Sequence, residues 1–453
     1  FVDFGYIDGY KPSTSNKKNS RTHLFANYNA DLDLEDFITS NLFVSIQKVS
    51  NDTYLKIFDG NIFKSKVSPS DYDLLTSEAK FILNNENYNF TTGFQSFENL
   101  NLSSSDRYQF ILPYYEFDRD IFNDYKNGFI NFSSTGSNDL TNTNNLKTKV
   151  INNLNYTSLD LLSNNGFKSG YNIYLKNLNT VAKNDEKFKS SPQMELMSIF
   201  EFNSSLPLIK QSNYSTNYLT PKASIRFNPG DMKDYSSNDR SINVDGIFDI
   251  NRLALDDSFE EGKSLTLGLD YKKTSISDIN KFFEAKIATV YRDKKEEFIP
   301  NSSAISDENS NFFGKITSNY LNFTQLSYDF IMDNDLNTLV YNSLNASLSY
   351  KNLKTTFNFV EENNPIGDTN TLENKTTLKF NDQNFLSFNT RRNRKINLTE
   401  YYNFIYEYKN DCLVAGIKYN KTYYNDRDLE PTENFMLSIT LIPLTSIEQK
   451  IAN

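Results

Sequence analysis

The chain has 453 residues, enough for two or three ordinary domains or for one very large β-barrel. Its net charge is -10, which argues against nucleic acid as the main partner. One cysteine and one histidine leave little room for a Cys/His metal site or a Cys–His nucleophile pair, and no apolar run reaches the ~18 residues of a membrane-spanning helix.

Aromatic residues are unusually frequent for such a polar chain. There are 37 Phe and 29 Tyr, although the mean hydropathy is -0.59. A transmembrane β-barrel combines these properties, because aromatic girdles and a lipid-facing apolar stripe alternate with a polar interior. Its strands have only about 9–11 residues, so each gives a weak signal. We therefore expect an all-β chain folded as a large antiparallel up-and-down transmembrane barrel.

The first residues already read as a strand. Val2, Phe4 and Tyr6 alternate with other residues from the start, so we expect a mature fragment whose N-terminal part is missing. His23 lies inside another strand-like run, where we expect a surface or lumenal histidine. The most apolar strand, residues 106–117, contains Pro113, which predicts a bulge or a strand end because proline cannot donate to the ladder.

Long strands are predicted over residues 147–162, 166–181 and 193–202, followed by a strand over 218–228. A polar loop then covers residues 229–245. Residues 245–262 lack period-two alternation and are rich in acids at their C-terminal end. The segment is interpreted as a loop folded into the lumen or an extracellular cap.

Four carboxylates in this segment invite a second interpretation. Asp256, Asp257, Glu260 and Glu261 offer the oxygens that divalent cations prefer, but EF-hand spacing is absent. We favour a solvated acidic loop over a cation site, and we expect no metal in the protein.

From residue 283 onward the pattern is a run of hairpins in which tight corners alternate with longer polar loops. Short turns on one side and long loops on the other are typical of outer-membrane barrels. In the last predicted strand, Phe435, Leu437, Ile439 and Leu441 alternate with Ser438 and Thr440. We count roughly 22 strands, with no interior linker, and therefore predict one barrel domain over residues 1–453.

Three segments resemble a known family. They are IYEYKNDCLVAGIKYNKTYYNDRDLEPTENFMLSITLIPL at 405–444, LTPKASIRFNPG at 219–230 and DGIFDINRLALDDSFEEGKSLTLGLDY at 245–271. They are similar to the LptD family of lipopolysaccharide-assembly proteins, also called organic solvent tolerance proteins. The family's barrel has 26 strands preceded by a periplasmic jellyroll. The resemblance therefore implies that the jellyroll and the first strands are absent from this chain.

The resemblance also implies a function and partners. Lipopolysaccharide would be inserted into the outer leaflet of a Gram-negative outer membrane, its sugars passing through the lumen and its acyl chains leaving through a lateral gate between the first and last strands. An LptE-like lipoprotein would plug the lumen, and a periplasmic bridge protein would deliver lipopolysaccharide to the jellyroll. Membrane lipids would surround the barrel.

Particular residues acquire expected roles from this resemblance. The family has a cysteine at the place of Cys412, disulfide-bonded to a cysteine outside this chain; the alternative is a buried free thiol. The gate strand would contain Phe435, Leu437, Ser438, Ile439, Thr440 and Leu441, with Pro443 either weakening the seam or merely ending the strand. Arg391, Arg392, Arg394 and Lys395 would contact phosphates of the lipid, or form a solvated loop end.

Other classes of function are weighed against transport. A porin or a plugged nutrient receptor is the main alternative and predicts small-solute conductance. An outer-membrane lipase would depend on His23, the single histidine, and a β-solenoid adhesin would need a short repeat that we do not find. We find no P-loop, nucleophile elbow or metal-ligand cluster, so we expect neither catalysis nor a cofactor.

Overall fold

The structure, a computed structural model, describes residues 1–10, 19–57, 66–102, 106–124, 126, 128–185, 187–321, 323–363, 365–423, 431–441 and 445–452. The chain forms two compact units. Unit 1 contains residues 1–159 and 173–198, and unit 2 contains residues 160–172 and 199–424 with the C-terminal residues from 430 onward. No helix among the described residues is long and apolar enough to span a membrane.

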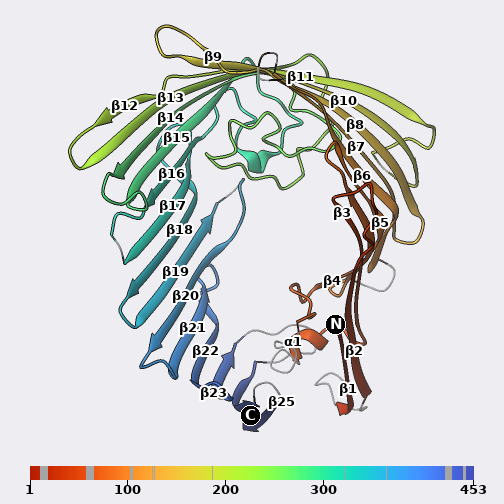
Figure 1. The fold of residues 1–453 in the computed structure, drawn as a ribbon, viewed down its shortest axis with the longest axis vertical. Coiled ribbons are helices and arrows are strands. Elements are labelled where there is room, and N and C mark those ends of the chain that lie inside the picture. Colours follow the sequence, from red (N-terminus) through yellow and green to blue (C-terminus); the bar gives the residue numbers. More distant parts are fainter. Residues whose placement is uncertain are drawn as a thin grey trace. The chain divides into compact units, whose positions relative to one another are not determined.

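Unit 1 is a run of antiparallel strands, each paired with the next in the sequence (Figure 1). A short helix, α1 (Tyr54–Ile57), follows the third strand. The register of β5 and β6 shifts between Ile111 and Tyr114, which confirms a bulge at Pro113. The strands are β1 (Val2–Tyr10), β2 (Asn19–Asp31), β3 (Thr39–Val49), β4 (Leu74–Asn84), β5 (Tyr88–Asn99), β6 (Tyr108–Asp124), β7 (Gly128–Thr141) and β8 (Asn145–Thr157).

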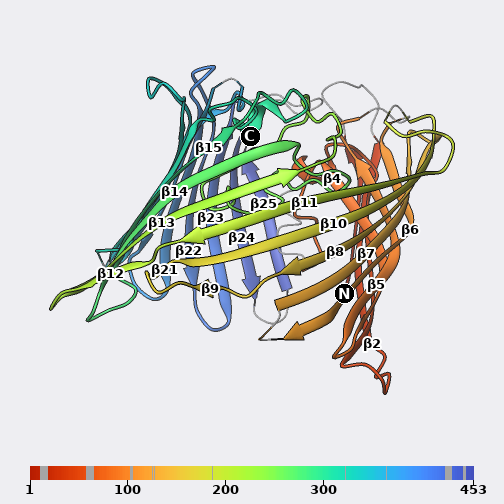
Figure 2. The same cartoon turned by 90° about the horizontal axis from the view of Figure 1, so that it is seen from above.

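Unit 2 is likewise an antiparallel meander, in which neighbouring strands from β13 to β25 pair in sequence order (Figure 2). The strands β10 (Lys168–Lys183) and β11 (Gln193–Ser205) contribute residues to both units. A 3₁₀ turn, η1 (Asn301–Ser303), lies between β15 and β16. The remaining strands are β9 (Leu161–Leu162), β12 (Leu208–Gln211), β13 (Ser215–Asn228), β14 (Gly262–Ser275), β15 (Phe282–Arg292), β16 (Phe312–Ser318), β17 (Thr324–Met332), β18 (Leu339–Tyr350), β19 (Leu353–Glu362), β20 (Asn370–Lys379), β21 (Asn384–Asn393), β22 (Leu398–Lys409), β23 (Leu413–Thr422), β24 (Glu433–Leu441) and β25 (Thr445–Ala452).

The number of strands is close to the expected 22. Of the 25 strands, β9 pairs with β10 as β8 does, and β12 pairs with β13 as β11 does. Each of these short strands therefore continues the strand before it, and the described chain makes 23 passes. The prediction that residues 435–441 form the last strand is wrong, because β25 follows and pairs with β24 along its length.

Side-chain polarity is inverted relative to that of a water-soluble sheet. On β13, Ile225 and Phe227 are 54% and 40% exposed, whereas Ser224 and Arg226, which alternate with them, are buried. On β24 the predicted alternation is confirmed, with Leu437 and Ile439 exposed and Ser438 partly covered. We call the face with the exposed apolar side chains the outer face and the opposite face the inner face. An apolar exterior over a polar interior is the pattern of a transmembrane β-barrel, which confirms the predicted fold class.

Candidate functional site

Two loops of unit 2 fold onto the inner face instead of extending from the strand ends. Residues 229–261 connect β13 to β14, and residues 293–311 connect β15 to β16 and include η1. Figure 1 shows these green loops beside β13–β18. Backbone hydrogen bonds join them: Tyr235 N–H donates to the carbonyl of Phe298 at 3.0 Å. We call the two loops together the insert.

An apolar cluster anchors the insert. Ile247, Leu253 and Leu255 from the first loop are buried with Ile299 and Ile305 from the second. They pack on inner-face side chains of the strands, namely Ala288, Val290, Phe313, Ile331 and Val340. Residues 245–262 show no period of two because their apolar side chains fill a small irregular core and not a strand face.

A glycine lets the insert approach the sheet closely. A Cβ added to Gly268 on the inner face of β14 would lie 2.7 Å from the ring of Phe248. Only glycine leaves room for an aromatic ring at that distance from the backbone. The insert is therefore matched to this part of the sheet.

A buried ionic network holds the end of the first loop. Arg252 Nε donates to Glu260 Oε2 at 2.7 Å, and both Arg252 Nη2 and Arg292 Nη2 donate to Glu260 Oε1. The two guanidinium groups are fully buried. Arg292 Nε also donates to the carbonyl of Ile305 at 2.7 Å, so the same arginine binds both loops. Because every charge in this network faces an opposite charge, the network fixes the insert to the strands.

Burial alone would raise the pKa of Glu260. Arg252 and Arg292 outweigh that effect and lower the pKa, so the carboxylate is ionised at neutral pH. Asp257, which accepts a hydrogen bond from Tyr235, is also buried. The prediction of a solvated acidic loop is therefore wrong, and the lumenal alternative describes this segment. Within the described ranges no three His, Cys, Asp or Glu side chains are grouped to hold a metal.

A row of charges crosses the inner face at the margin of the insert. Asp270 on β14 lies opposite Lys286 on β15, which lies opposite Lys315 on β16. Lys315 in turn lies opposite Asp329 on β17. Asp245 of the insert bridges the two lysines, with Oδ1 2.8 Å from Lys286 Nζ and Oδ2 2.7 Å from Lys315 Nζ. We call these five residues the charged row.

Unit 1 carries a separate inner cluster around the single histidine. His23 is 6% exposed, lies 2.8 Å from the Tyr54 hydroxyl through Nδ1, and stacks on Phe25. Its Nε2 is 3.3 Å from Asp3. Apolar residues around α1, including Leu55 and Leu75, cover this cluster. The lumenal interpretation of His23 agrees with these contacts and the surface interpretation does not, since the ring is buried.

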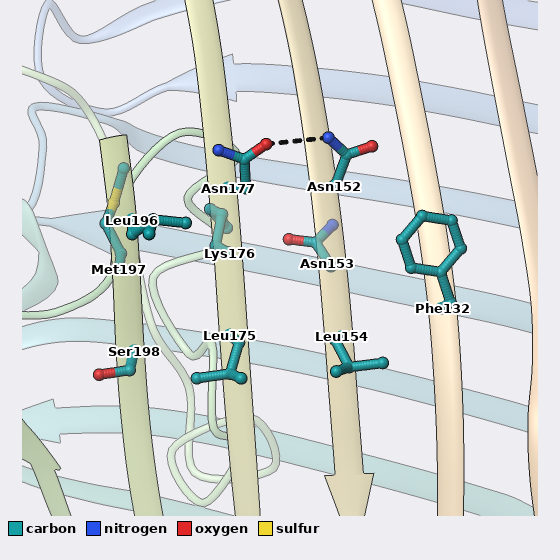
Figure 3. Close-up of a pocket in the computed structure, with 10 residues that line it drawn as sticks. All are labelled: Phe132, Asn152, Asn153, Leu154, Leu175, Lys176, Asn177, Leu196, Met197 and Ser198. Atoms are coloured by element: carbon teal, nitrogen blue, oxygen red, sulfur yellow. Dashed lines mark hydrogen bonds between the residues drawn. The ribbon is translucent and has the colours of Figure 1, made fainter. Parts of the chain in front are cut away.

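A pocket of about 430 Å³ lies on the outer face of unit 1, among β7, β8, β10 and β11 (Figure 3). Phe132, Leu154, Leu175 and Leu196 line it, and Leu196 is 74% exposed. Beside them Asn152 Nδ2 donates to Asn177 Oδ1 at 3.0 Å. Because its apolar lining belongs to the lipid-facing row, we assign no saccharide to this pocket.

Cys412 lies in the corner between β22 and β23, and its thiol is free and exposed. The alternative of a buried thiol is therefore wrong, and the disulfide stays a prediction. The proposed gate residues lie on β24, between β23 and β25, so this strand is not the last one. Pro443 lies outside the described residues, and the gate role of Phe435, Leu437, Ser438, Ile439, Thr440 and Leu441 stays a prediction.

The four basic residues proposed as phosphate contacts lie where β21 turns into β22. Arg391 Nε is 3.1 Å from Glu400, and Lys395 forms an ion pair with Asp368. Arg392 donates to Asn397, and Arg394 lies over the ring of Phe359. Two of the four charges thus have acidic partners, which weakens them as an anion site, although their role toward phosphate stays a prediction.

The apolar outer face, the polar inner face and the antiparallel meander define the class: a large β-barrel of the outer-membrane type. The family model described as "LptD: LPS transport system D" matches residues 21–384. The chain therefore belongs to the LptD family, as the sequence resemblance predicted. Its family and fold are those of a protein that transports lipopolysaccharide at the outer membrane of a Gram-negative bacterium.

No curated protein sequence matches the chain. Among solved structures, the ferric enterobactin receptor PfeA of Pseudomonas aeruginosa is 11% identical, with a TM-score of 0.30 over 99% of this chain and 73% of that one. The siderophore receptor PirA of Acinetobacter baumannii is 8% identical, with a TM-score of 0.33 over 97% and 73%. The copper transporter OprC is 8% identical, with a TM-score of 0.32 over 82% and 71%. Similarity at this level carries no argument about function.

Proposed function

We propose that this protein inserts lipopolysaccharide into the outer leaflet, with the saccharide passing along the polar inner face and the acyl chains leaving sideways between the first and last strands of the complete barrel. The inverted polarity of the strands is the observation that carries this proposal. A saccharide gains hydrogen bonds from a polar wall, whereas acyl chains gain nothing there and partition into lipid.

The lateral exit follows from the energetics of a barrel in a membrane. An open strand edge in hydrocarbon leaves amide groups unpaired at a cost of several kcal/mol each. An exit for acyl chains therefore has to be a seam that parts briefly and closes again. We propose that this seam joins the first and last strands of the barrel.

The proposed work is transport and involves no bond-making. An LptE-like lipoprotein in the lumen and a periplasmic bridge protein that docks to the jellyroll are the proposed partners. Family membership supports lipopolysaccharide as cargo and supports partners of the same transport system. Copurification of a small lipoprotein with the full-length protein tests the first partner.

A cross-link tests the seam. Cysteines are placed in the first and last strands of the barrel, in a Cys412→Ser background, and are oxidised. Delivery of lipopolysaccharide to the outer leaflet is then measured. We expect delivery to stop on oxidation and to recover on reduction. A control disulfide between Ser347→Cys and Thr356→Cys, which lie opposite each other on β18 and β19, should leave delivery unchanged. Delivery through an oxidised seam would overturn the lateral exit.

A further inference from the structure

The charged row places two cations directly opposite each other on neighbouring strands. Lys286 and Lys315 are register partners, and like charges in that relation destabilise a sheet. Asp270, the register partner of Lys286, forms an ion pair with Lys222. The carboxylate of Asp329 is 3.5 Å from Lys315 Nζ. Among the described residues, therefore, no carboxylate of the strands contacts both lysines.

Such a carboxylate comes from the insert. The carboxylate of Asp245 spans the lysine pair with one oxygen on each ammonium group, at 2.8 and 2.7 Å. Glu284 reaches Lys286 only at 3.9 Å, the outer limit of an ion pair. The lysines outweigh the effect of burial and lower the pKa of Asp245, which keeps it ionised. Because acids surround the pair at longer range, the site suits one anionic group of low charge.

The ion pairs of Asp245 are more exposed to solvent than the buried network that holds the rest of the insert to the sheet. The side chain of Asp245 is 37% exposed, and those of Lys286 and Lys315 are 23% and 27% exposed. Glu260, by contrast, is 5% exposed among buried arginines. Asp245 also lies in a local turn, where Asn243 Oδ1 accepts from the backbone N–H of Asp245 and Gly246. The turn can therefore move while the buried network holds the insert.

We infer that Lys286 and Lys315 form a binding site for a single oxyanion of the transported saccharide, a sugar carboxylate or a phosphate ester, and that Asp245 occupies this site between passages. Either ligand presents two oxygens to the two ammonium groups as the Asp245 carboxylate does. The next inner-face positions away from the insert are polar, with Thr317 and Ser327 opposite each other, and they suit sugar hydroxyls. This inference rests on the proposed function, because it names where the saccharide is held.

Sugar binding to the full chain in detergent tests the site. The probes are galacturonate, which carries a carboxylate, and glucose 1-phosphate, with neutral galactose as the blank, each titrated by calorimetry. An attached carboxylate competes at an effective concentration on the order of millimolar. We therefore expect Asp245→Ala to bind at least one anionic probe about ten-fold more tightly than the unaltered chain, since its competitor is removed. The stronger of the two probes identifies the anion that the site prefers.

Two further variants separate a site from a general charge effect. Adding Lys286→Gln and Lys315→Gln to Asp245→Ala should abolish binding. Adding Lys375→Gln instead should leave binding unchanged, because Lys375 lies on the inner face of β20, opposite Thr356 of β19, and outside the charged row. The inference is overturned if Asp245→Ala binds neither anionic probe, or if binding survives the loss of both lysines.

Transport separates this inference from the proposed function. In a protein with both Lys286→Gln and Lys315→Gln, we expect delivery of lipopolysaccharide to fall several-fold, while the Lys375→Gln control keeps its rate. Equal delivery by all three proteins overturns a role for the site and leaves the transport function standing. If the unaltered protein delivers no lipopolysaccharide, the proposed function fails, and the sugar titrations alone decide whether the site binds oxyanions. Circular dichroism checks that each variant is folded.

Discussion

Glu260 and Arg292 lie 32 residues apart in the sequence, and the guanidinium of Arg292 donates to the carboxylate of Glu260 in the buried core beneath the insert. The contact joins the end of the loop after β13 to the end of β15. Because Arg252 approaches the same carboxylate, one acidic side chain closes a network of two cations. The docking of the insert therefore depends strongly on Glu260.

Replacing Glu260 by Gln should release the insert. Two buried guanidinium groups would lose their shared anion, and breaking a buried ion pair in this way costs about 3–5 kcal/mol. Hydrogen exchange should show faster exchange of the Tyr235 and Glu296 amides, which are bonded within the insert. Asp382→Asn is the control, since Asp382 is 96% exposed in its ion pair with Lys379, and such exposed pairs contribute little to stability. Unchanged exchange in Glu260→Gln would contradict this account of the docking.

Acid should also release the insert. The pKa values of Asp245 and Glu260 are lowered, so their stabilisation is complete above the unfolded values of about 3.9 and 4.3 and is lost as pH falls below them. Burial and the nearby Glu261 raise the pKa of Glu296. Glu296 therefore favours the docked insert as the pH falls, but this single group opposes the effect of Asp245 and Glu260.

Pepsin digestion checks the pH dependence. Cleavage within residues 229–261 should increase only as the pH falls below about 4, where the carboxylates of Asp245 and Glu260 bind protons in the released loop more readily than in the docked one. Asp245→Asn removes one of the two contributions, so its dependence on pH should be weaker. Cleavage with equal ease at pH 5 would show that these carboxylates do not hold the loop.

A positive charge should destabilise the protein much more at one position of β18 than at the adjacent position. Leu344 lies in the outer row with Tyr328 and Phe359, whereas Asn345 lies in the inner row with Ser327. Leu344→Arg should cost about 2–4 kcal/mol, as for a cation on the lipid face of a barrel, and Asn345→Arg should cost less than about 1 kcal/mol. Urea unfolding in lipid bilayers measures both. Equal costs would mean that the two faces are wrongly assigned.

Gly262 should tolerate no side chain. Its φ is +79°, and an added Cβ would lie 2.2 Å from Glu296 Oε1. We expect Gly262→Ala to cost roughly 1–3 kcal/mol through backbone strain, with the clash in addition. Adding Glu296→Ala should relieve the clash but leave the cost of the backbone strain. Gly230→Ala is the matched control, because its Cβ would lie 3.6 Å from the nearest atom. A similar loss of stability in Gly230→Ala would show that the positive φ of Gly262 is not the cause.

Cys412 should react with a maleimide in the folded protein, since its thiol is exposed. We expect labelling without denaturant at a rate close to that of a small free thiol, and none in Cys412→Ser. In the full-length protein, protection that disappears on reduction would support the disulfide. Labelling of this chain only after unfolding would contradict the exposed position.

The strands could be predicted from the sequence because their signal is local. Leu265, Leu267 and Leu269 alternate with polar residues, and the structure puts them on the outer face of β14. The strand β25 was missed because its eight residues contain only Ile447, Ile451 and Ala452 as apolar side chains. What defines it is its pairing with β24, which leaves little trace in the amino-acid pattern.

The candidate site was harder to predict because its members are distant in sequence. The sequence pattern indicates Glu260 as one of several solvated acids. No local feature of the sequence predicts that Arg252 and Arg292 form ion pairs with it. Lys286 and Lys315 look like ordinary inward-facing polar residues. The sequence does contain one indication of the site. The apolar residues Ile247, Leu253 and Leu255 lie within an acid-rich loop, and apolar side chains there predict that the loop packs against another surface.

The apolar cluster of the insert contains Met232 and also Ile331, Val340 and Ile366. Met232 and Ile366 are far apart in the sequence, so the insert gains its full set of apolar contacts only when the strands between them have paired. Closing so long a segment is slow relative to forming the neighbouring turns. We therefore expect the insert to dock late in folding, after the hairpins around it have formed.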